Sequence, residues 1–291
     1  CVVEANEGLG GAVMWTGGQV AKTLAQLACE QRQTQSLLRG ETKWHVEGMS
    51  LETARDIVTR SAVERAMQLD QLVVALGQTR KFNRPSLKRA EKSGTIERFR
   101  GRAKFVGEGE VAVTPSPNDV TGSEELIVEA DNFLVCTGGW FRQLPKFPID
   151  GEFIITSQHV LKLQEWPKSC LILGARANGC EIATVLKAFG GSETETHLVN
   201  EGRDRVFDEE DEDVSAYVQE GLERSGVTVH NRTKLEYAKV DAERGTVECR
   251  LVQSVWMPPP DNDPGQKPAI RRVSKTVRVE KLVVCAGRLP N

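Results

Sequence analysis

The sequence lacks several features that would point to particular classes of protein. No apolar run approaches the roughly 18 residues that span a bilayer, and the N-terminus has neither the basic nor the apolar region of a signal peptide. Positive charge is not in excess, because 38 basic residues stand against 41 acidic ones. These absences predict an intracellular, soluble protein without membrane or nucleic-acid partners. They do not distinguish the cytoplasm from an organelle such as the mitochondrion or plastid.

Cysteines at redox or metal spacing are also missing. The seven cysteines form no C-x-x-C pair and no zinc spacing with the four histidines. Cys136 in FLVCTGG and Cys285 in LVVCAGR lie in apolar stretches that predict buried strands, where a reduced cysteine behaves as a small hydrophobe. The pattern predicts a reducing compartment, no disulfide framework and no metal site.

The first half of the chain predicts two long helices followed by short strands. Apolar residues at helical spacing favour helices over about 18–38 and 51–76. Between 94 and 135, alternating segments separated by turn residues predict an antiparallel meander that returns to a buried strand. The proline-punctuated segment LPKFPIDGEF is the best candidate for a domain boundary, which divides the chain into 1–148 and 149–291.

The second half alternates strands and helices. CLILG, THLVN and GVTVH predict strands, and helices are expected between them over 179–189 and 214–225. A hairpin interrupted by MPPPDNDPGQKP follows, and KLVVCAG predicts the last buried strand. This alternation predicts an α/β dinucleotide-binding domain with a parallel sheet.

The turn GARANG between the first strand and helix of this domain stands where a phosphate-binding glycine turn belongs. Gly174 and Gly179 take the first and third glycine places of the G-x-G-x-x-G fingerprint, and Arg176 takes the second. The Arg176 side chain would either intrude on the pyrophosphate or pair with it through the guanidinium. A purely structural turn, with cofactor binding lost, is an equal alternative.

The residue that reads the cofactor ribose is expected at the end of the second strand, at Asn200 or Glu201. Glu201 would favour NAD, whereas Arg203 and Arg205 would favour the 2′-phosphate of NADP. The acidic run 208–213 is interpreted as a solvated surface.

Five motifs occur in a defined order: a strand ending in Glu4, LGG at 9–11, TGG at 137–139, the turn 174–179 with Glu181 after it, and GRLPN at 287–291. This order resembles the pyridine nucleotide-disulfide oxidoreductases, the family of dihydrolipoamide dehydrogenase, glutathione reductase and mercuric reductase. The resemblance implies two nested Rossmann-like domains, a partial FAD domain with the meander over 1–148 and a nearly complete NAD(P) domain over 149–291. It implies FAD and NAD or NADP as cofactors, hydride transfer from nicotinamide to flavin, and a small electron acceptor as partner.

The same resemblance implies that the chain is incomplete at both ends. The family's first strand and glycine turn would precede Cys1, and its flavin-contacting and dimerisation segments would follow GRLPN. A homodimer is therefore expected only where that C-terminal domain is present. Weak or no FAD binding is expected of the 291-residue segment.

The resemblance also assigns cofactor-binding positions. Glu4 falls where the family binds the adenosine ribose of FAD, and Gly10 and Gly11 belong to the flavin-side LGG motif. The flavin-contacting turn corresponds to Thr137 and Gly138. The closing motif that returns to the flavin domain includes Gly287, Arg288, Pro290 and Asn291.

Val13 and Gly18 stand where the family has its two redox cysteines, so internal disulfide chemistry is expected to be lost. Lys22 and Glu181 match the family's lysine–glutamate pair near the flavin and are the candidate catalytic residues. Their alternative roles are a surface lysine and a glutamate at a helix start. Ala177 replaces the aromatic gate over the nicotinamide.

Two functions remain open from the sequence. One is an FAD- and NAD(P)H-dependent oxidoreductase that passes electrons to a quinone, oxygen or another small acceptor. The other is a catalytically degenerate paralogue or fragment that serves as a binding or structural protein.

Overall fold

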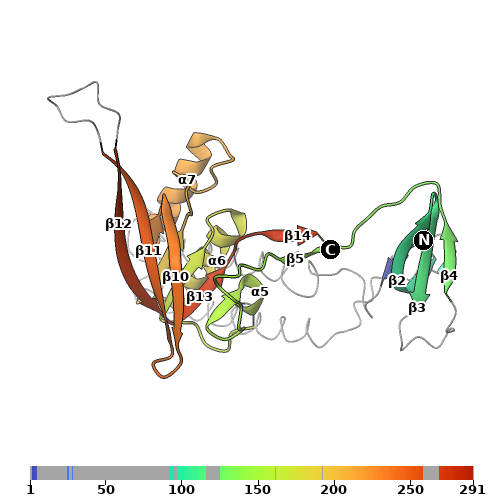
Figure 1. Cartoon of the computed structure of the whole chain (residues 1–291), viewed down its shortest axis with the longest axis horizontal. Coiled ribbons are helices and arrows are strands. Elements are labelled where there is room, and N and C mark those ends of the chain that lie inside the picture. The colour runs from blue at the N-terminus through green and yellow to red at the C-terminus, as the bar shows by residue number, and fades with distance from the viewer. Residues whose placement is uncertain are drawn as a thin grey trace, which may run out of the picture. The chain divides into compact units, whose positions relative to one another are not determined.

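The computed structural model describes residues 2–4, 25, 28, 92–94, 97–115, 125–160, 162–191, 193–257 and 269–290 (Figure 1). These residues fall into two compact units. The first holds the described residues up to Gly138, except Ala25 and Ala28, and the second holds those two alanines and everything from Gly139 on.

The first unit is a four-stranded sheet in the order β1-β2-β3-β4. β1 (Val2–Glu4) lies parallel to β2 (Arg98–Gly107), and β3 (Glu110–Pro115) and β4 (Leu126–Glu129) continue antiparallel. The turn between β2 and β3 uses Gly109 at φ 76°, which only glycine adopts without strain. The predicted antiparallel meander is therefore present.

The apolar segment after β4 does not form the buried strand that its composition predicted. Residues 130–138 belong to no strand, and Leu134 and Val135 are 91% and 65% exposed. Cys136 is exposed as well, so its predicted burial is wrong. Apolar composition alone does not bury a strand, because burial also requires neighbouring strands and a layer against each face.

The second unit is built on a parallel five-stranded sheet in the order β6-β13-β7-β8-β9. The strands are β6 (Ile154–Thr156), β7 (Ser169–Leu173), β8 (Glu195–Val199), β9 (Val227–His230) and β13 (Lys281–Val284). The chain moves outward from β7 to β9 and then returns to the other side of β7 with β13. This reversal of strand order creates a switch point beside β7, where α/β sheets bind their ligands.

Helices and a second sheet cover the two faces of the parallel sheet. α6 (Ala177–Gly190) joins β7 to β8, α7 (Glu212–Arg224) joins β8 to β9, and the short α5 (Ser157–Val160) follows β6. The antiparallel sheet β10 (Thr233–Asp241), β11 (Thr246–Met257) and β12 (Ala269–Val279) is inserted between β9 and β13. A two-stranded ribbon pairs β5 (Gly139–Phe141) with β14 (Arg288–Pro290).

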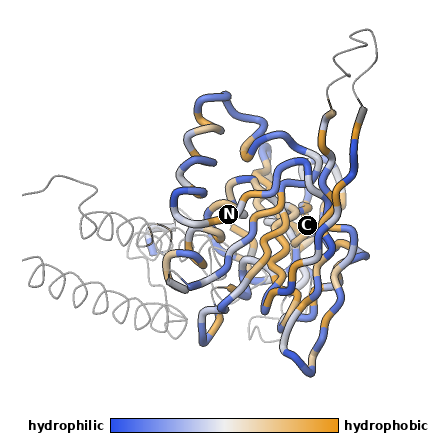
Figure 2. Tube along the Cα trace, turned by 90° about the vertical axis from the view of Figure 1, so that its left-hand side faces the viewer, coloured by the Kyte–Doolittle hydropathy of each residue, from blue (hydrophilic) through white to orange (hydrophobic). Residues whose placement is uncertain are grey.

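Side chains along β7 point alternately to the two faces of the parallel sheet, so this strand contributes to a hydrophobic core on each face. Cys170 and Ile172 pack with α6 residues such as Ile182, whereas Leu171 and Leu173 pack with the antiparallel sheet. A strand buried on both faces reads as a continuous apolar run, which is why CLIL contains no polar residue. The strands of the parallel sheet are accordingly the most hydrophobic part of the tube in Figure 2.

The strands and helices predicted for the second half of the chain are present within two residues of their expected bounds, except the last strand. KLVVCAG forms a strand only as far as Val284, so Cys285 follows the strand and is half-buried. Of the helix predicted over 18–38, Ala25 and Ala28 are described, both are helical, and Ala28 packs against Val185 and Ala188. The helix predicted over 51–76 lies outside the described residues.

Candidate functional site

The glycine turn at the switch point begins where β7 ends. Gly174 adopts φ +113°, and a Cβ there would lie 2.5 Å from the carbonyl oxygen of Cys285. The amide of Gly174 donates to the carbonyl of Val199 at 2.9 Å, and that of Cys285 donates to Leu173 at 2.8 Å. The turn is thus held between β8 and β13, and its first position accepts no side chain.

Gly179 brings the start of α6 onto this turn. A Cβ on Gly179 would lie 1.7 Å from the carbonyl oxygen of Gly174, so only glycine permits the approach. The N-cap residue Arg176 makes no side-chain capping hydrogen bond, and the first turn of α6 contains no acidic residue. The first and third glycines therefore have the geometry of a phosphate-binding turn, with the positive end of a helix at it.

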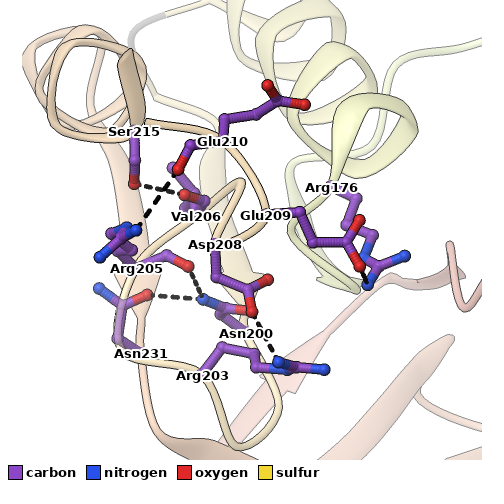
Figure 3. A network of polar contacts seen from close by, with 10 residues as sticks. All are labelled: Arg176, Asn200, Arg203, Arg205, Val206, Asp208, Glu209, Glu210, Ser215 and Asn231. Atoms are coloured by element: carbon purple, nitrogen blue, oxygen red, sulfur yellow. Dashed lines mark hydrogen bonds and ion pairs between the residues drawn. The ribbon is translucent and has the colours of Figure 1, made fainter. Parts of the chain in front are cut away.

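Arg176, at the second glycine place, directs its guanidinium to an acidic partner. It forms an ion pair with Glu209 of the loop between β8 and α7, and both side chains are 61% exposed (Figure 3). The sequence allowed two roles for Arg176, intrusion and phosphate pairing, and the structure adds a third. The guanidinium is already engaged by a carboxylate.

Asn200 follows β8 directly and is a fixed part of the structure at this edge. It is 6% exposed, and its side-chain amide donates to the carbonyl of Arg205 at 2.7 Å and to Oδ1 of Asn231 at 3.1 Å (Figure 3). Its backbone amide donates to the carbonyl of His230 at 3.0 Å. Glu201 is more exposed, with a carboxylate oxygen 3.9 Å from Nζ of Lys234 on β10. Asn200 thus ties the loop after β8 to the turn after β9, and Glu201 is the more accessible of the two candidates.

Arg203 and Arg205 also have acidic partners. Arg203 pairs with Asp208 at 2.7 Å, and Arg205 pairs with Glu212 at 3.0 Å. The segment 208–213, interpreted from the sequence as solvated surface, therefore supplies a carboxylate to each of Arg176, Arg203 and Arg205. The sequence showed the charges, but their pairing depends on how the loop folds back on the turn.

The flavin-side positions are described only in part. Thr137 and Gly138 are exposed, and Gly138 adopts φ +77°. Arg288 on β14 lies over the Phe141 ring at 4.7 Å and donates to the carbonyl of Gly139. The carbonyl of Gly287 accepts from the amide of Arg142 at 3.1 Å. These contacts hold the ribbon β5-β14 together.

Glu181 is half-buried in the first turns of α6, beside the buried thiol of Cys180. Its predicted partner Lys22 lies outside the described residues, as do Gly10, Gly11, Val13, Gly18 and Asn291. The backbone of Glu4 ends β1, but its side chain lies outside them too.

The described thiols in the second unit are poor nucleophiles. Burial raises the pKa of Cys170, Cys180 and Cys249 to about 12, so each stays protonated at neutral pH. The five cysteines in the described part of the chain are all free. Among those same residues, no group of acidic, histidine and cysteine side chains is arranged to hold a metal ion. No helix among them is long and apolar enough to cross a membrane.

Sequence reasoning missed one buried polar cluster. His197 on β8 and His230 on β9 are joined Nδ1 to Nε2 at 3.0 Å, and Nε2 of His197 lies 2.8 Å from Glu195. The histidines are 5% and 8% exposed. Their 33-residue separation hides the pairing, although a histidine within each apolar strand was a signal that a polar partner is needed.

Comparison with known proteins places these features in one family. Residues 6–291 match the family described as pyridine nucleotide-disulphide oxidoreductase. A dihydrolipoyl dehydrogenase of Bacillus subtilis is 35% identical over 165 residues, which are 57% of this chain and 32% of the relative. A dihydrolipoyl dehydrogenase of Zymomonas mobilis is 27% identical over 215 residues, 74% of this chain and 43% of the relative. The chain thus spans less than half the length of these relatives.

Solved structures agree on the fold. An HOCl-induced flavoprotein disulfide reductase from Escherichia coli, solved as the Cu(II) complex of a mutant, superposes with a TM-score of 0.61 at 17% identity. The match covers 99% of this chain and 51% of that one. LpdA from Mycobacterium tuberculosis gives a TM-score of 0.56 at 18% identity, covering 99% of this chain and 52% of the other.

The family's α/β fold accounts for both units, and its members use FAD and NAD(P). With the matched segment running from residue 6 to residue 291, this chain belongs to the pyridine nucleotide-disulphide oxidoreductase family.

Proposed function

We propose that the complete protein is an FAD- and NAD(P)H-dependent oxidoreductase in which the nicotinamide donates hydride to the flavin. The observation that carries the proposal is the turn at the switch point, where Gly174 and Gly179 leave no room for a Cβ. In a dinucleotide-binding turn the first glycine permits the tight bend and the third lets the helix pack closely on the strand, and both places have this geometry here. The N-terminus of α6, which has no side-chain cap, begins at this turn.

The residues of this edge have distinct roles in the proposal. The turn 174–179 holds the pyrophosphate through main-chain amides, and Asn200 keeps the neighbouring loops in place. Glu201 is available to accept a hydrogen bond from the adenosine ribose. Arg203 and Arg205 are paired with Asp208 and Glu212, so a 2′-phosphate would have to displace these carboxylates, which gives a modest preference for NAD over NADP.

Glu181 and Lys22 would set the charge near the flavin, which supplies a two-electron acceptor when bound. Thr137, Gly138, Gly287 and Arg288 would contribute to its site, with Glu4, Gly10 and Gly11. Because Val13 and Gly18 hold no sulfur, the electrons leave to a small acceptor such as a quinone or oxygen and not through an internal disulfide. A homodimer is expected where the complete protein carries the family's C-terminal domain.

The absorbance spectrum of the complete protein tests this function. We expect flavin bands at about 450 nm that bleach under anaerobic NADH, because hydride transfer reduces the flavin. The matched control is the same titration with the oxidised nucleotide, which should leave the bands unchanged. A folded protein with no flavin bands would refute the proposal.

A second function, that of a catalytically inactive binding or structural paralogue, is favoured by Arg176 and Ala177. Arg176 replaces the glycine at the pyrophosphate and is engaged by Glu209, and Ala177 replaces the family's aromatic gate over the nicotinamide. A colourless, folded protein that binds neither nucleotide would support this alternative.

A further inference from the structure

The loop that joins β8 to α7 is fastened to the glycine turn by its main chain. The amide of Phe207 donates to the carbonyl of Ala175 at 3.2 Å. Phe207 adopts φ 49°, a left-handed conformation that is unusual for a bulky residue and persists only where surrounding contacts impose it.

Buried neighbours supply those contacts. Val206 is fully buried, and its carbonyl accepts a hydrogen bond from the Ser215 hydroxyl of α7 at 2.5 Å (Figure 3). Phe207 packs against the core beneath α6. The loop is therefore anchored on the turn, and it carries its acidic residues to a defined place.

Glu209 stands two residues after this anchor and pairs with Arg176. The two contacts of the loop fall on Ala175 and Arg176, adjacent residues of the phosphate-binding turn. Asp208 and Glu212 are taken by Arg203 and Arg205, so each of the three arginines has its own carboxylate. The carboxylate of Glu209 thus holds the one guanidinium that belongs to the turn itself.

We propose that Glu209 is an internal competitor for Arg176, an autoinhibitory contact that an anionic ligand must displace when it binds at residues 174–179. This inference rests on the proposed function, because the ligand it concerns is the dinucleotide. Carboxylate and phosphate are both anionic, and both accept paired hydrogen bonds from a guanidinium, so they can compete for the same arginine. Because both side chains are largely exposed, the pair is weak enough for a phosphate to replace it.

Substituting Glu209→Gln in the purified protein tests the competition. The variant keeps the side-chain shape and removes the charge, so we expect a Kd about two- to fivefold lower for both NADH and inorganic pyrophosphate. Kd values come from calorimetric titration. The matched control is Glu220→Gln, which removes an equally exposed carboxylate paired with Arg224 on α7, and its Kd values should equal those of the wild type.

A double-mutant cycle shows whether the effect acts through Arg176. Arg176→Gln should weaken binding, and adding Glu209→Gln to it should produce no further change, because no guanidinium is left to release. A gain that persists in the Arg176→Gln background would overturn the competition, and so would a Glu209→Gln variant that binds like the wild type. If neither the wild type nor the Glu209→Gln variant binds NADH or pyrophosphate, the competition is also overturned, because removing the carboxylate then exposes no anion site.

The proposed function is judged separately, by the bleaching of the flavin. If NADH reduces the flavin but Glu209→Gln leaves the Kd for NADH unchanged, the proposed function stands and the competition by Glu209 is refuted.

Discussion

Acid is expected to weaken the second unit through the buried imidazole of His230. Burial is the main cause that lowers the pKa of His230 from 6.5 to about 4, with smaller effects from Lys275 and His197. The imidazole is 8% exposed and lies on β9, next to His197, which is in turn bonded to Glu195. Protonation therefore places a charge in an apolar interior beside one lysine and a second histidine.

The sign and size of the effect follow from linkage. Because the pKa is lower in the folded state, the unfolded chain binds more protons, and stability is complete above pH 6.5 and falls as the pH decreases toward 4. A difference of this size corresponds to about 3 kcal/mol in total, of which about 2 kcal/mol is lost by a pH of about 5.

Urea unfolding at neutral pH and at a pH of about 5 measures this loss, and His230→Gln provides the comparison. The substitution removes the titrating group, so the difference in unfolding free energy between the two pH values should shrink by about 2 kcal/mol. His159→Gln is the control, because His159 lies on α5 and bonds to Thr156 outside this cluster. If the His230→Gln protein lost as much stability in acid as the wild type, the reasoning would be refuted.

Two further predictions concern the turn and its acidic loop. Gly179→Ala should destabilise the protein by roughly 1–3 kcal/mol, because the new methyl group would meet the carbonyl oxygen of Gly174. Gly221→Ala on α7, where the added methyl group would meet nothing within 4 Å outside its own helix backbone, should instead be neutral or stabilising in the same thermal melts. Equal losses at both sites would contradict the packing argument. Asp208→Asn combined with Glu212→Gln frees Arg203 and Arg205, so the Kd for NADPH should fall relative to that for NADH in paired titrations. An unchanged ratio would show that the two arginines do not face the ribose.

Much of the second unit was predictable because its signals are local. A continuous apolar strand, a glycine turn and a helix with one apolar face are each read within about ten residues, and each strand–helix unit allows few topologies. CLIL, the turn 174–179 and α6 therefore appear where the sequence predicted them.

The failures occurred where burial depends on distant partners. FLVC has the composition of a buried strand, yet Leu134 is 91% exposed, because composition says nothing of the neighbours that would cover it. The His197–His230 pair joins two strands whose alignment is a property of the sheet. Neither the exposure of Leu134 nor the pairing of the two histidines can be predicted from a short stretch of sequence.

The sequence by itself determined the dinucleotide fold and the family, because the glycine positions and the order of the motifs are properties of the linear chain. It also predicts that the internal disulfide is lost, since Val13 and Gly18 contain no sulfur. The tertiary structure alone decided what Arg176 does. Its guanidinium has no fixed partner in a linear chain, and the partner became Glu209 only because Val206 is buried and Phe207 is bonded to Ala175, which brings a carboxylate 33 residues away to the glycine turn.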